Sequence, residues 1–288
     1  MEPAGDRANT ALGRDGADHP EGALAGQRAV VVGGGSGIGL GSARALARDG
    51  AAVTIAGRTE QKLVDAAATL ADEGLEVAHV ACDALDSASV QHAVDVASDD
   101  ERRLHIAVVV PGLGAITPVL LFDDDDFSAQ IDANVRPIYL FLKYAGRAMV
   151  RAGGGSFVAI SSTAAVFSTK YLASYAAGKA AVDQLVRVAA NELGELGVRV
   201  NSVQPGMTRT PGTERAFDNP EMMAAFLAEQ PIGRHGEVED IAQAVRYFAG
   251  PESSWVTGQL LTVDGGNTLR SFIDYRNLIP LPDQGDLA

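Results

Sequence analysis

Tyr175 and Lys179 stand four residues apart in the segment SYAAGKAAV, and both side chains can take part in proton transfer. On a helix this spacing places the two residues on one face, where the ammonium group can lie close to the phenol. A free tyrosine has a pKa of ~10, and a nearby cation favours its ionised form. The pair predicts a general acid and base whose pKa is lowered by the lysine. Because the chain has 6 Tyr and few Lys, a chance pair at this spacing is unusual.

A second candidate site is the glycine-rich segment VGGGSGIG, which stands between an apolar strand and an amphipathic helix. Its glycines at Gly33, Gly37 and Gly39 are small enough for the backbone to approach a pyrophosphate at the positive end of the helix. This predicts a dinucleotide site. The spacing GxxxGxG differs from the commoner GxGxxG, so the segment taken alone also fits a flexible loop.

Arg58 follows the next strand, at the position where an NAD-preferring protein usually presents Asp or Glu to the ribose hydroxyls. A guanidinium group there can bind a 2'-phosphate through charge-assisted hydrogen bonds worth roughly 1.5–3 kcal/mol. We therefore predict NADP(H) as the cofactor, with NAD(H) as the less favoured alternative. The competing interpretation of Arg58 is a solvated residue at the start of a helix.

The segments around these residues predict alternating strands and helices. Strand-like segments occupy residues 27–32, 51–58, 75–83, 105–112, 155–162, 198–206 and 259–266. Helical spacing follows the glycine-rich loop and continues over residues 59–74, 87–98, 126–148 and 174–193. The alternation predicts an α/β fold of the Rossmann type, a doubly wound parallel β-sheet with helices on both faces. We expect a single domain over residues 24–268, a disordered N-terminal tail over 1–23 and a C-terminal extension over 269–288.

Composition limits the class of partner. The 288 residues are 47% hydrophobic, which suffices for a buried core. A net charge of -14 argues against nucleic acid and anionic membranes as partners, because phosphate binding needs clustered Lys and Arg. Cys82 is the only cysteine, so no intrachain disulfide can form. The sequence shows no signal peptide, transit peptide, membrane-spanning run or zinc-ligand spacing, so we expect a cytoplasmic protein without a metal site.

From about residue 24 to residue 267 the chain resembles the short-chain dehydrogenases/reductases, in their single-domain branch of about 250 residues. The resemblance rests on motifs in a fixed order: GGGSGIG, Asp83 after the third strand, Asn134 in IDANV, GSFVAISS, YAAGK, VQPGMTRT and the stretch from PIGRHGEVEDIAQAV to WVTGQLLTVDGG. It implies a catalytic tetrad of Asn134, Ser162, Tyr175 and Lys179. Ser162 lies 13 residues before Tyr175, which is the spacing that the family shows.

The resemblance also implies a role for each residue of the tetrad. Ser162 would hydrogen-bond the substrate oxygen, and Tyr175 would give that oxygen a proton during reduction. Lys179 would bind the nicotinamide ribose and lower the tyrosine pKa, while Asn134 would hold a water of the proton relay. The cofactor-binding residues predicted from the loop and from the resemblance are Gly33, Gly35, Ser36, Gly37, Ile38, Gly39, Arg58, Asp83, Ala84, Gly112, Tyr175, Lys179, Pro205, Gly206 and Thr208.

Two segments depart from the family pattern. The family usually has Thr before the first loop glycine and Asn-Asn-Ala-Gly after the fourth strand; here Val32 and the sequence VVPG at residues 109–112 take these places. In the family the Thr and the Asn-rich turn are hydrogen-bonded to each other. Loss of one partner of a buried hydrogen bond costs ~1–3 kcal/mol, whereas replacement of both partners by apolar groups can be nearly neutral. We interpret the two changes as compensating.

Two features concern the helix that carries Asn134. Pro137 donates no hydrogen bond to the Ala133 carbonyl and so predicts a kink. The kink would either help to form a water site beside Asn134 or be a tolerated irregularity.

The acidic run at residues 123–126 predicts a helix beginning at its last member, Asp126, in preference to a cation site.

These observations predict an NADP(H)-dependent carbonyl reductase or alcohol dehydrogenase that interconverts a ketone and a secondary alcohol of small-molecule size. Residues 207–230 match the family's mobile lid, and their methionines and aromatics favour an apolar, fairly bulky substrate such as a steroid, polyketide or cyclic ketone. The resemblance implies a homotetramer or homodimer assembled through the helices carrying Asn134 and Tyr175. The alternative is a noncatalytic NADP(H)-binding sensor or scaffold. An epimerase or an enoyl reductase fits the motif spacing less well.

Overall fold

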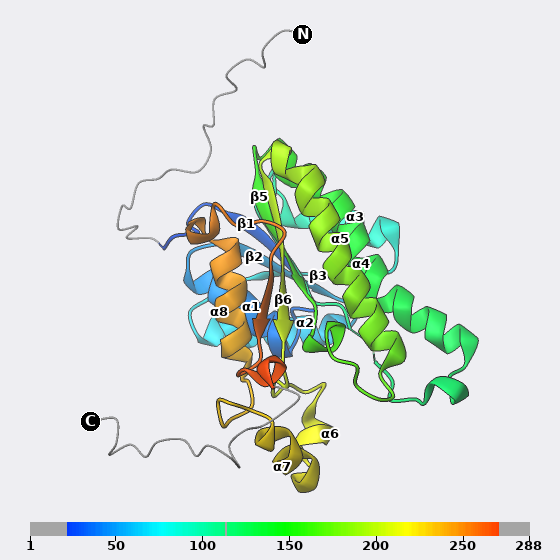
Figure 1. Cartoon of the computed structure of the whole chain (residues 1–288). Coiled ribbons are helices and arrows are strands. Elements are labelled where there is room, and N and C mark those ends of the chain that lie inside the picture. Colours follow the sequence, from blue (N-terminus) through cyan, green and yellow to red (C-terminus); the bar gives the residue numbers. More distant parts are fainter. Residues whose placement is uncertain (1–21, 113, 271–288) are drawn as a thin grey trace.

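The structure is a computed structural model in which residues 22–112 and 114–270 are described. Its centre is a parallel sheet with the strand order β3-β2-β1-β4-β5-β6-β7 (Figure 1). The strands are β1 (Arg28–Val32), β2 (Ala52–Gly57), β3 (Ala78–Ala81), β4 (Ile106–Val109), β5 (Gly155–Ile160), β6 (Val198–Pro205) and β7 (Leu260–Val263). The predicted doubly wound α/β fold of the Rossmann type is confirmed.

Two layers of helices cover the sheet, one on each face (Figure 1). One layer contains α3 (Ser87–Ala97), α4 (Asp124–Arg151) and α5 (Ala173–Leu193); the other contains α1 (Gly37–Arg48), α2 (Glu60–Asp72) and α8 (Val238–Ala249). Side chains alternate along β1, so that Val30 and Val32 join the first core while Ala29 and Val31 join the second. Burial on both faces explains why the central strands β1, β2 and β4 are apolar at nearly every position.

The direction of winding reverses between β1 and β4. From β1 the chain passes outward to β2 and β3, then returns to place β4 on the other side of β1. Val32 at the end of β1 lies opposite Ala56 of β2 and Val109 of β4. In open parallel sheets, ligands bind at the carboxyl ends of the strands beside such a reversal. The glycine-rich loop begins at this point, directly after Val32.

The helix carrying Asn134 is longer than the sequence predicted. It begins at Asp124, not Asp126, because Asp123 is the N-cap: its Oδ1 accepts from the backbone N–H groups of Asp125 (3.0 Å) and Asp126 (3.1 Å). The acidic run thus caps the helix and places three carboxylates in its first turn, where they complement the helix dipole. The helix also continues to Arg151 and passes through Pro137 without interruption.

The connections at the carboxyl ends of the strands contain most of the remaining elements. The predicted lid contains α6 (Glu214–Phe217) and α7 (Pro220–Ala228), which lie below the sheet in Figure 1. Short 3-10 helices are η1 (Val119–Leu121), η2 (Thr163–Ala165), η3 (Gly194–Leu196), η4 (Pro251–Ser253) and η5 (Asn267–Leu269). The helix α8 was not predicted as an element, although its residues form part of a family motif.

The predicted N-terminal tail and C-terminal extension lie for the most part outside the described residues. Where the description begins, the Ala23 N–H donates to Asp49 Oδ1 (3.1 Å), and Leu24 is fully buried. Across residues 22–112 and 114–270, no helix combines the length and the apolar character needed to cross a membrane.

Candidate active site

The residues of the predicted tetrad meet where α4 and α5 pass the carboxyl end of β5. Ser162 follows β5 and begins η2, while Tyr175 and Lys179 lie on the first two turns of α5. Asn134 lies in the middle of α4 and is completely buried; its Nδ2 donates to the Gln130 carbonyl (2.8 Å). The tetrad therefore combines side chains from α4, α5 and the connection after β5.

Close packing of α4 against α5 fixes the position of Asn134. Gly178 lies on α5 between Tyr175 and Lys179, and a Cβ atom at this glycine would stand 2.9 Å from the Asn134 Cβ. That separation is too short for a methyl group, so the absence of a side chain at residue 178 lets the two helices approach. The glycine in the motif YAAGK thus has a packing role beside the two candidate catalytic residues.

Lys179 is buried and points its ammonium group at backbone oxygens. Its Nζ donates to the carbonyls of Pro111 (2.8 Å) and Ile160 (3.0 Å), and lies 5.4 Å from the centre of the Tyr175 ring. The side chain is 1% exposed, and this burial lowers the pKa of Lys179 to about 7, against the opposing effect of the Asp183 carboxylate. A lysine with such a pKa can change its charge near neutral pH.

The pKa of Tyr175 differs from the sequence-based prediction. Burial raises the pKa of Tyr175 above its ordinary value, while the interaction with the Ser162 side chain acts in the opposite direction. The prediction of a lowered pKa is therefore wrong for this state of the protein. The reason is desolvation of the phenol, because the backbone at Gly114 packs so closely that a Cβ there would lie 3.1 Å from the ring. A raised pKa keeps the phenol of Tyr175 protonated at neutral pH.

Gln130 connects the tetrad to the loop after β4, and sequence reasoning missed it. Its Oε1 accepts from the Ala115 N–H (3.0 Å) and from Ser174 Oγ (2.8 Å). One side chain thus joins the loop that covers Tyr175 to the first turn of α5. Gln130 precedes Asn134 by one helical turn, which was the available sequence signal.

A cavity of about 180 Å³ at the reversal of strand order brings together several of the predicted cofactor residues. It is lined by the ends of β1, β2 and β4, the turn after β3 and the middle of α4. Among the predicted residues, its lining includes Gly33, Arg58, Asp83, Ala84 and Gly112. The cavity also contains Val32, Val109, Ala133 and Pro137. A mostly apolar cavity at this place, with Arg58 in its lining, fits the adenosine part of a dinucleotide.

The glycine-rich loop has the backbone geometry that phosphate binding needs. Gly33 has φ +78° and Gly37 has φ +52°, a region that favours glycine. A Cβ at Gly39 would lie 2.1 Å from the Gly33 carbonyl oxygen, so only glycine fits there. The predicted residues Gly35, Ser36 and Ile38 complete the turn, with Ser36 as the exposed N-cap of α1. The first N–H groups of α1 form the positive end of the helix dipole, suited to a pyrophosphate.

The segment after β6 lies against this loop. Pro205 ends β6, the Gly206 N–H donates to the Val263 carbonyl (2.9 Å), and Thr208 Oγ1 donates to the Gly206 carbonyl (3.0 Å). Thr210 packs against the glycine-rich turn, since a Cβ at Gly37 would lie 3.3 Å from the Thr210 Cβ. The structure therefore brings Thr210, two residues after the predicted Thr208, beside the start of α1.

The two departures from the family pattern lie opposite each other. Val32 and Val109 are partners in the register of β1 and β4, and both are buried in the same core. The Val110 N–H donates to the Val32 carbonyl (3.2 Å), which joins the strands one residue further on. Both members of the pair are apolar, so neither leaves a buried polar group without its partner, which supports the interpretation of compensating changes.

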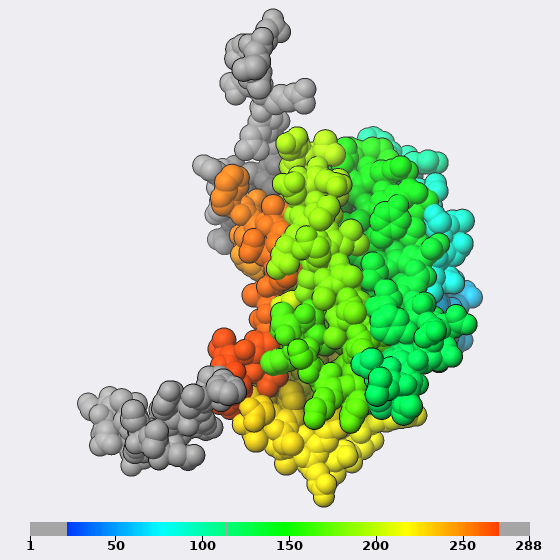
Figure 2. All heavy atoms as spheres, turned by 45° about the vertical axis from the view of Figure 1, so that its right-hand side comes forward, coloured from blue at the N-terminus to red at the C-terminus, as the bar shows by residue number. Residues whose placement is uncertain are grey.

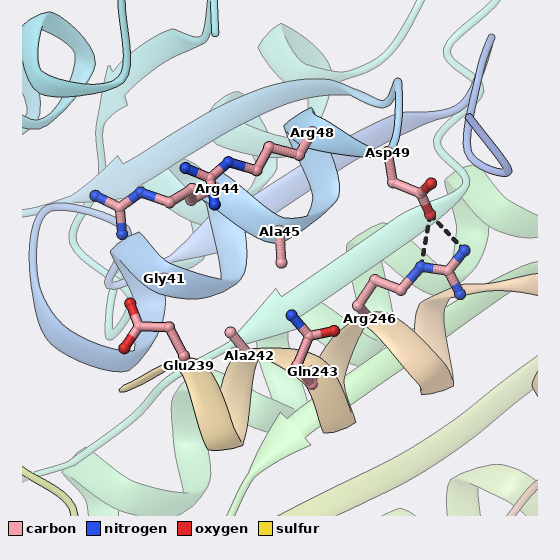
Figure 3. Close-up of a pocket in the computed structure, with 9 residues that line it drawn as sticks. All are labelled: Gly41, Arg44, Ala45, Arg48, Asp49, Glu239, Ala242, Gln243 and Arg246. Atoms are coloured by element: carbon pink, nitrogen blue, oxygen red, sulfur yellow. Dashed lines mark hydrogen bonds and ion pairs between the residues drawn. The ribbon is translucent and has the colours of Figure 1, made fainter. Parts of the chain in front are cut away.

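A separate cavity of about 240 Å³ between α1 and α8 has charged walls (Figure 3). Arg44 and Arg48 bind Glu73, and Arg246 binds Asp49. Figure 3 shows the last of these pairs joining the end of α1 to α8. Because each of these arginines forms an ion pair with a carboxylate, we interpret this cavity as part of the packing interface between the two helices.

Comparison with known proteins agrees with the fold and the motifs. A family model described as enoyl-(acyl carrier protein) reductase matches residues 32–268. The chain is 34% identical to an A-factor type gamma-butyrolactone 1'-reductase from Streptomyces virginiae over 252 residues, which cover 86% of this chain and 98% of the relative.

Two solved structures are similar over most of their length. A short-chain type dehydrogenase/reductase from Mycobacterium ulcerans matches with a TM-score of 0.83 and 37% identity, covering 89% of this chain and 95% of that protein. A gluconate 5-dehydrogenase from Burkholderia cenocepacia J2315, in complex with NADP and tartrate, matches with a TM-score of 0.80 and 31% identity, covering 86% and 97%.

The chain belongs to the short-chain dehydrogenases/reductases. It is accordingly an oxidoreductase of a family whose members here act on alcohol- or ketone-type substrates. The family assignment made from the motifs is confirmed.

Proposed function

We propose that this protein is an NADP(H)-dependent carbonyl reductase or alcohol dehydrogenase. The observation that carries the proposal is the grouping of Ser162, Tyr175 and Lys179 at the carboxyl end of β5, with Lys179 buried against the tyrosine. The cavity lined by Arg58 and the glycine-rich loop fit a dinucleotide with a phosphate on its adenosine ribose. Three residues separate the tyrosine from the lysine, which favours carbonyl over enoyl chemistry within the family.

The proposed mechanism assigns each residue one task. The nicotinamide cofactor, when bound, supplies the hydride. Ser162 donates a hydrogen bond to the substrate oxygen and orients the carbonyl, and Tyr175 transfers its proton to that oxygen. The positive charge of Lys179 stabilises the phenolate that remains, which lowers the cost of proton transfer. Asn134 would hold a water of the proton relay, as the family resemblance implies.

We propose an apolar and fairly bulky substrate. The connection from β4 to α4 exposes Ile116, Val119, Leu120 and Leu121, each more than two thirds accessible. This connection is tied to the active-site helices, since the Thr117 N–H donates to the Tyr171 carbonyl just before α5 (2.9 Å). Exposed apolar side chains beside an active site favour a substrate with an apolar body.

Arg58→Ala should raise the KM for NADPH by roughly 10- to 150-fold, because it removes charge-assisted hydrogen bonds worth roughly 1.5–3 kcal/mol. The KM for NADH should change little, since NADH has no 2'-phosphate. Steady-state kinetics with both cofactors measures the two effects, and Arg48→Ala, which removes another exposed arginine, is the matched control. An equal loss with both cofactors would rule out the proposed role of Arg58.

We also propose self-association through α4 and α5, which lie side by side on the face shown in green in Figure 2. A groove of about 630 Å³ runs between the two helices. Its walls include the accessible apolar side chains of Tyr139, Val150, Val188 and Leu196. Burial of this surface against a second copy would remove apolar area from water.

Light scattering after gel filtration should give the mass of a dimer or tetramer for the native protein. Val188→Glu should shift the mass toward the monomer, because it places a charge in the apolar groove. Val64→Glu is the control, since Val64 is similarly exposed on α2. A monomeric native protein, or an unchanged assembly in Val188→Glu, would contradict this surface.

The function is tested by NADPH oxidation with a panel of ketones, from small diketones to steroids and polycyclic ketones. Turnover with at least one ketone, best with an apolar and bulky one, is expected. If NADPH binds but no ketone or corresponding alcohol turns over, the reductase proposal fails and a cofactor-binding sensor becomes the better explanation.

A further inference from the structure

Asp183 is a buried carboxylate that the mechanism above does not use. It lies on α5 with 4% of its surface exposed. Its Oδ2 accepts from Gln204 Nε2 (2.6 Å) and its Oδ1 from Ser202 Oγ (3.2 Å), both on β6. Thr262 Oγ1 on β7 donates to Gln204 Oε1 (2.8 Å), which orients the amide so that its Nε2 faces the carboxylate. Burial raises the pKa of Asp183, and the hydrogen bonds from Gln204 and Ser202 act in the opposite direction, because they favour the ionised carboxylate.

The same carboxylate stands one helical turn after Lys179. Residues four apart on a helix are neighbours, and the Asp183 charge acts to raise the pKa of Lys179. The two are also joined through Ser161, whose Oγ donates to the Lys179 carbonyl (3.3 Å) and whose side chain interacts with Asp183. Asp183 thus lies one helical turn after Lys179, as Tyr175 lies one turn before it, and its charge acts on the lysine.

The surroundings supply little other charge. Lys179 faces Tyr175 on α5, the Ile160 carbonyl on β5 and the Pro111 carbonyl after β4. Asp183 faces Ser161, Ser202 and Gln204, none of which is charged, and Arg187 on its own helix acts on it from a distance. Among the described residues, Asp183 is therefore the charged group that acts on Lys179, whereas the charge that acts on Asp183 is that of Arg187.

We propose that Asp183 is a positioning residue that holds Lys179 in its charged form inside a buried site. Burial of an ammonium group favours its neutral form, and a neutral lysine could not stabilise a phenolate. Asp183 offsets this cost from a rigid position set by β6 and β7. The inference rests on the proposed function only in that Lys179 acts on Tyr175; the coupling of the two buried charges is independent of any substrate.

Asp183→Asn tests the coupling with little change in shape. The new Oδ1 can accept from Gln204, and the new Nδ2 can donate to Ser202, whose hydroxyl rotates freely. The protein, labelled with ¹³C at lysine Cε, is titrated by NMR; the chain has only four lysines, and the loss of one signal in Lys179→Met assigns that of Lys179. The wild-type signal is expected to titrate near pH 7. In Asp183→Asn it should titrate about one pH unit lower.

A catalytic readout accompanies the titration. In the wild type, kcat/KM for ketone reduction should fall as pH rises through the Lys179 titration, and in Asp183→Asn this fall should occur at correspondingly lower pH. Glu195→Gln, which removes an exposed carboxylate just after α5, should change neither property. Ser202→Ala keeps the carboxylate but removes one of its donors, which raises the pKa of Asp183 further and so weakens its charge. The pKa of Lys179 should therefore fall, but by less than in Asp183→Asn.

An Lys179 signal that titrates at the same pH in wild type and Asp183→Asn overturns the proposal, whatever the activity. A shifted signal with an unmoved activity profile overturns the positioning role as well. If Asp183→Asn does not fold, Ser202→Ala decides by the same two readouts. Because the NMR titration needs no substrate, a protein that shows the shift but no turnover would count against the proposed function and not against the coupling.

Discussion

Replacement of Tyr175 by Phe is expected to lower kcat for ketone reduction by about 10²- to 10⁴-fold, the range that a positioned acid or base contributes. Phenylalanine keeps the ring that packs against Gly114 but has no proton to give to the substrate oxygen. Water could replace the phenol only by entering a site that the loop after β4 covers. The effect should therefore fall on kcat, with the affinity for NADPH nearly unchanged.

Steady-state kinetics and a fluorescence titration with NADPH separate these two quantities. Tyr247→Phe, which removes a phenol from α8 on the opposite face of the sheet, is the matched control and should keep full activity. If Tyr175→Phe retained activity within a few-fold of the wild type, Tyr175 would not be the proton donor, and the mechanism would have to be abandoned.

Gly39→Ala is expected to weaken NADPH binding by roughly 10- to 100-fold. The added Cβ would stand 2.1 Å from the Gly33 carbonyl oxygen, so the glycine-rich loop and the start of α1 must move apart. Overpacking of this kind costs about 1–3 kcal/mol. The displaced atoms belong to the backbone that is proposed to hold the pyrophosphate, so the cost falls on cofactor binding as well as on stability.

Isothermal titration with NADPH measures the affinity, and urea unfolding measures the stability of the same variant. Gly194→Ala is the control because a Cβ at Gly194 meets no atom within 4 Å and its backbone is already helical. That variant should bind NADPH normally and be as stable as the wild type or slightly more so. Normal NADPH affinity in Gly39→Ala would show that the cofactor phosphates bind elsewhere.

The architecture could be predicted because the sequence encodes it locally. All the predicted strands are present, and the most buried of them, β1, β2 and β4, are nearly continuous apolar runs. The pairing of Tyr175 with Lys179 follows from helical periodicity alone. The order and spacing of the family motifs placed Ser162 and Asn134 beside them. Turn chemistry likewise predicted a helix at the acidic run, with an error of two residues in its start.

The electrostatics could not be predicted in the same way. The pKa of Tyr175 is raised because a distant segment, the loop at Gly114, covers the phenol, and no local pattern reports that burial. Lys179 was expected to act on the tyrosine and to bind the nicotinamide ribose, yet its ammonium group donates to two backbone carbonyls, one in the loop after β4 and one at the end of β5. Asp183 was overlooked because its partners lie on β6, about twenty residues further along the chain.

The central claim, that this protein transfers hydride between NADPH and a carbonyl group, is tested most directly by an isotope. The wild-type protein is incubated with NADPH that carries deuterium at nicotinamide C4, on one face in one sample and on the other face in a second. The best ketone of the panel is added, and the product is analysed by mass spectrometry. We predict a secondary alcohol with one deuterium at the carbinol carbon from one of the two samples. An alcohol without deuterium from both samples, or no alcohol from any ketone in the panel, would contradict the account.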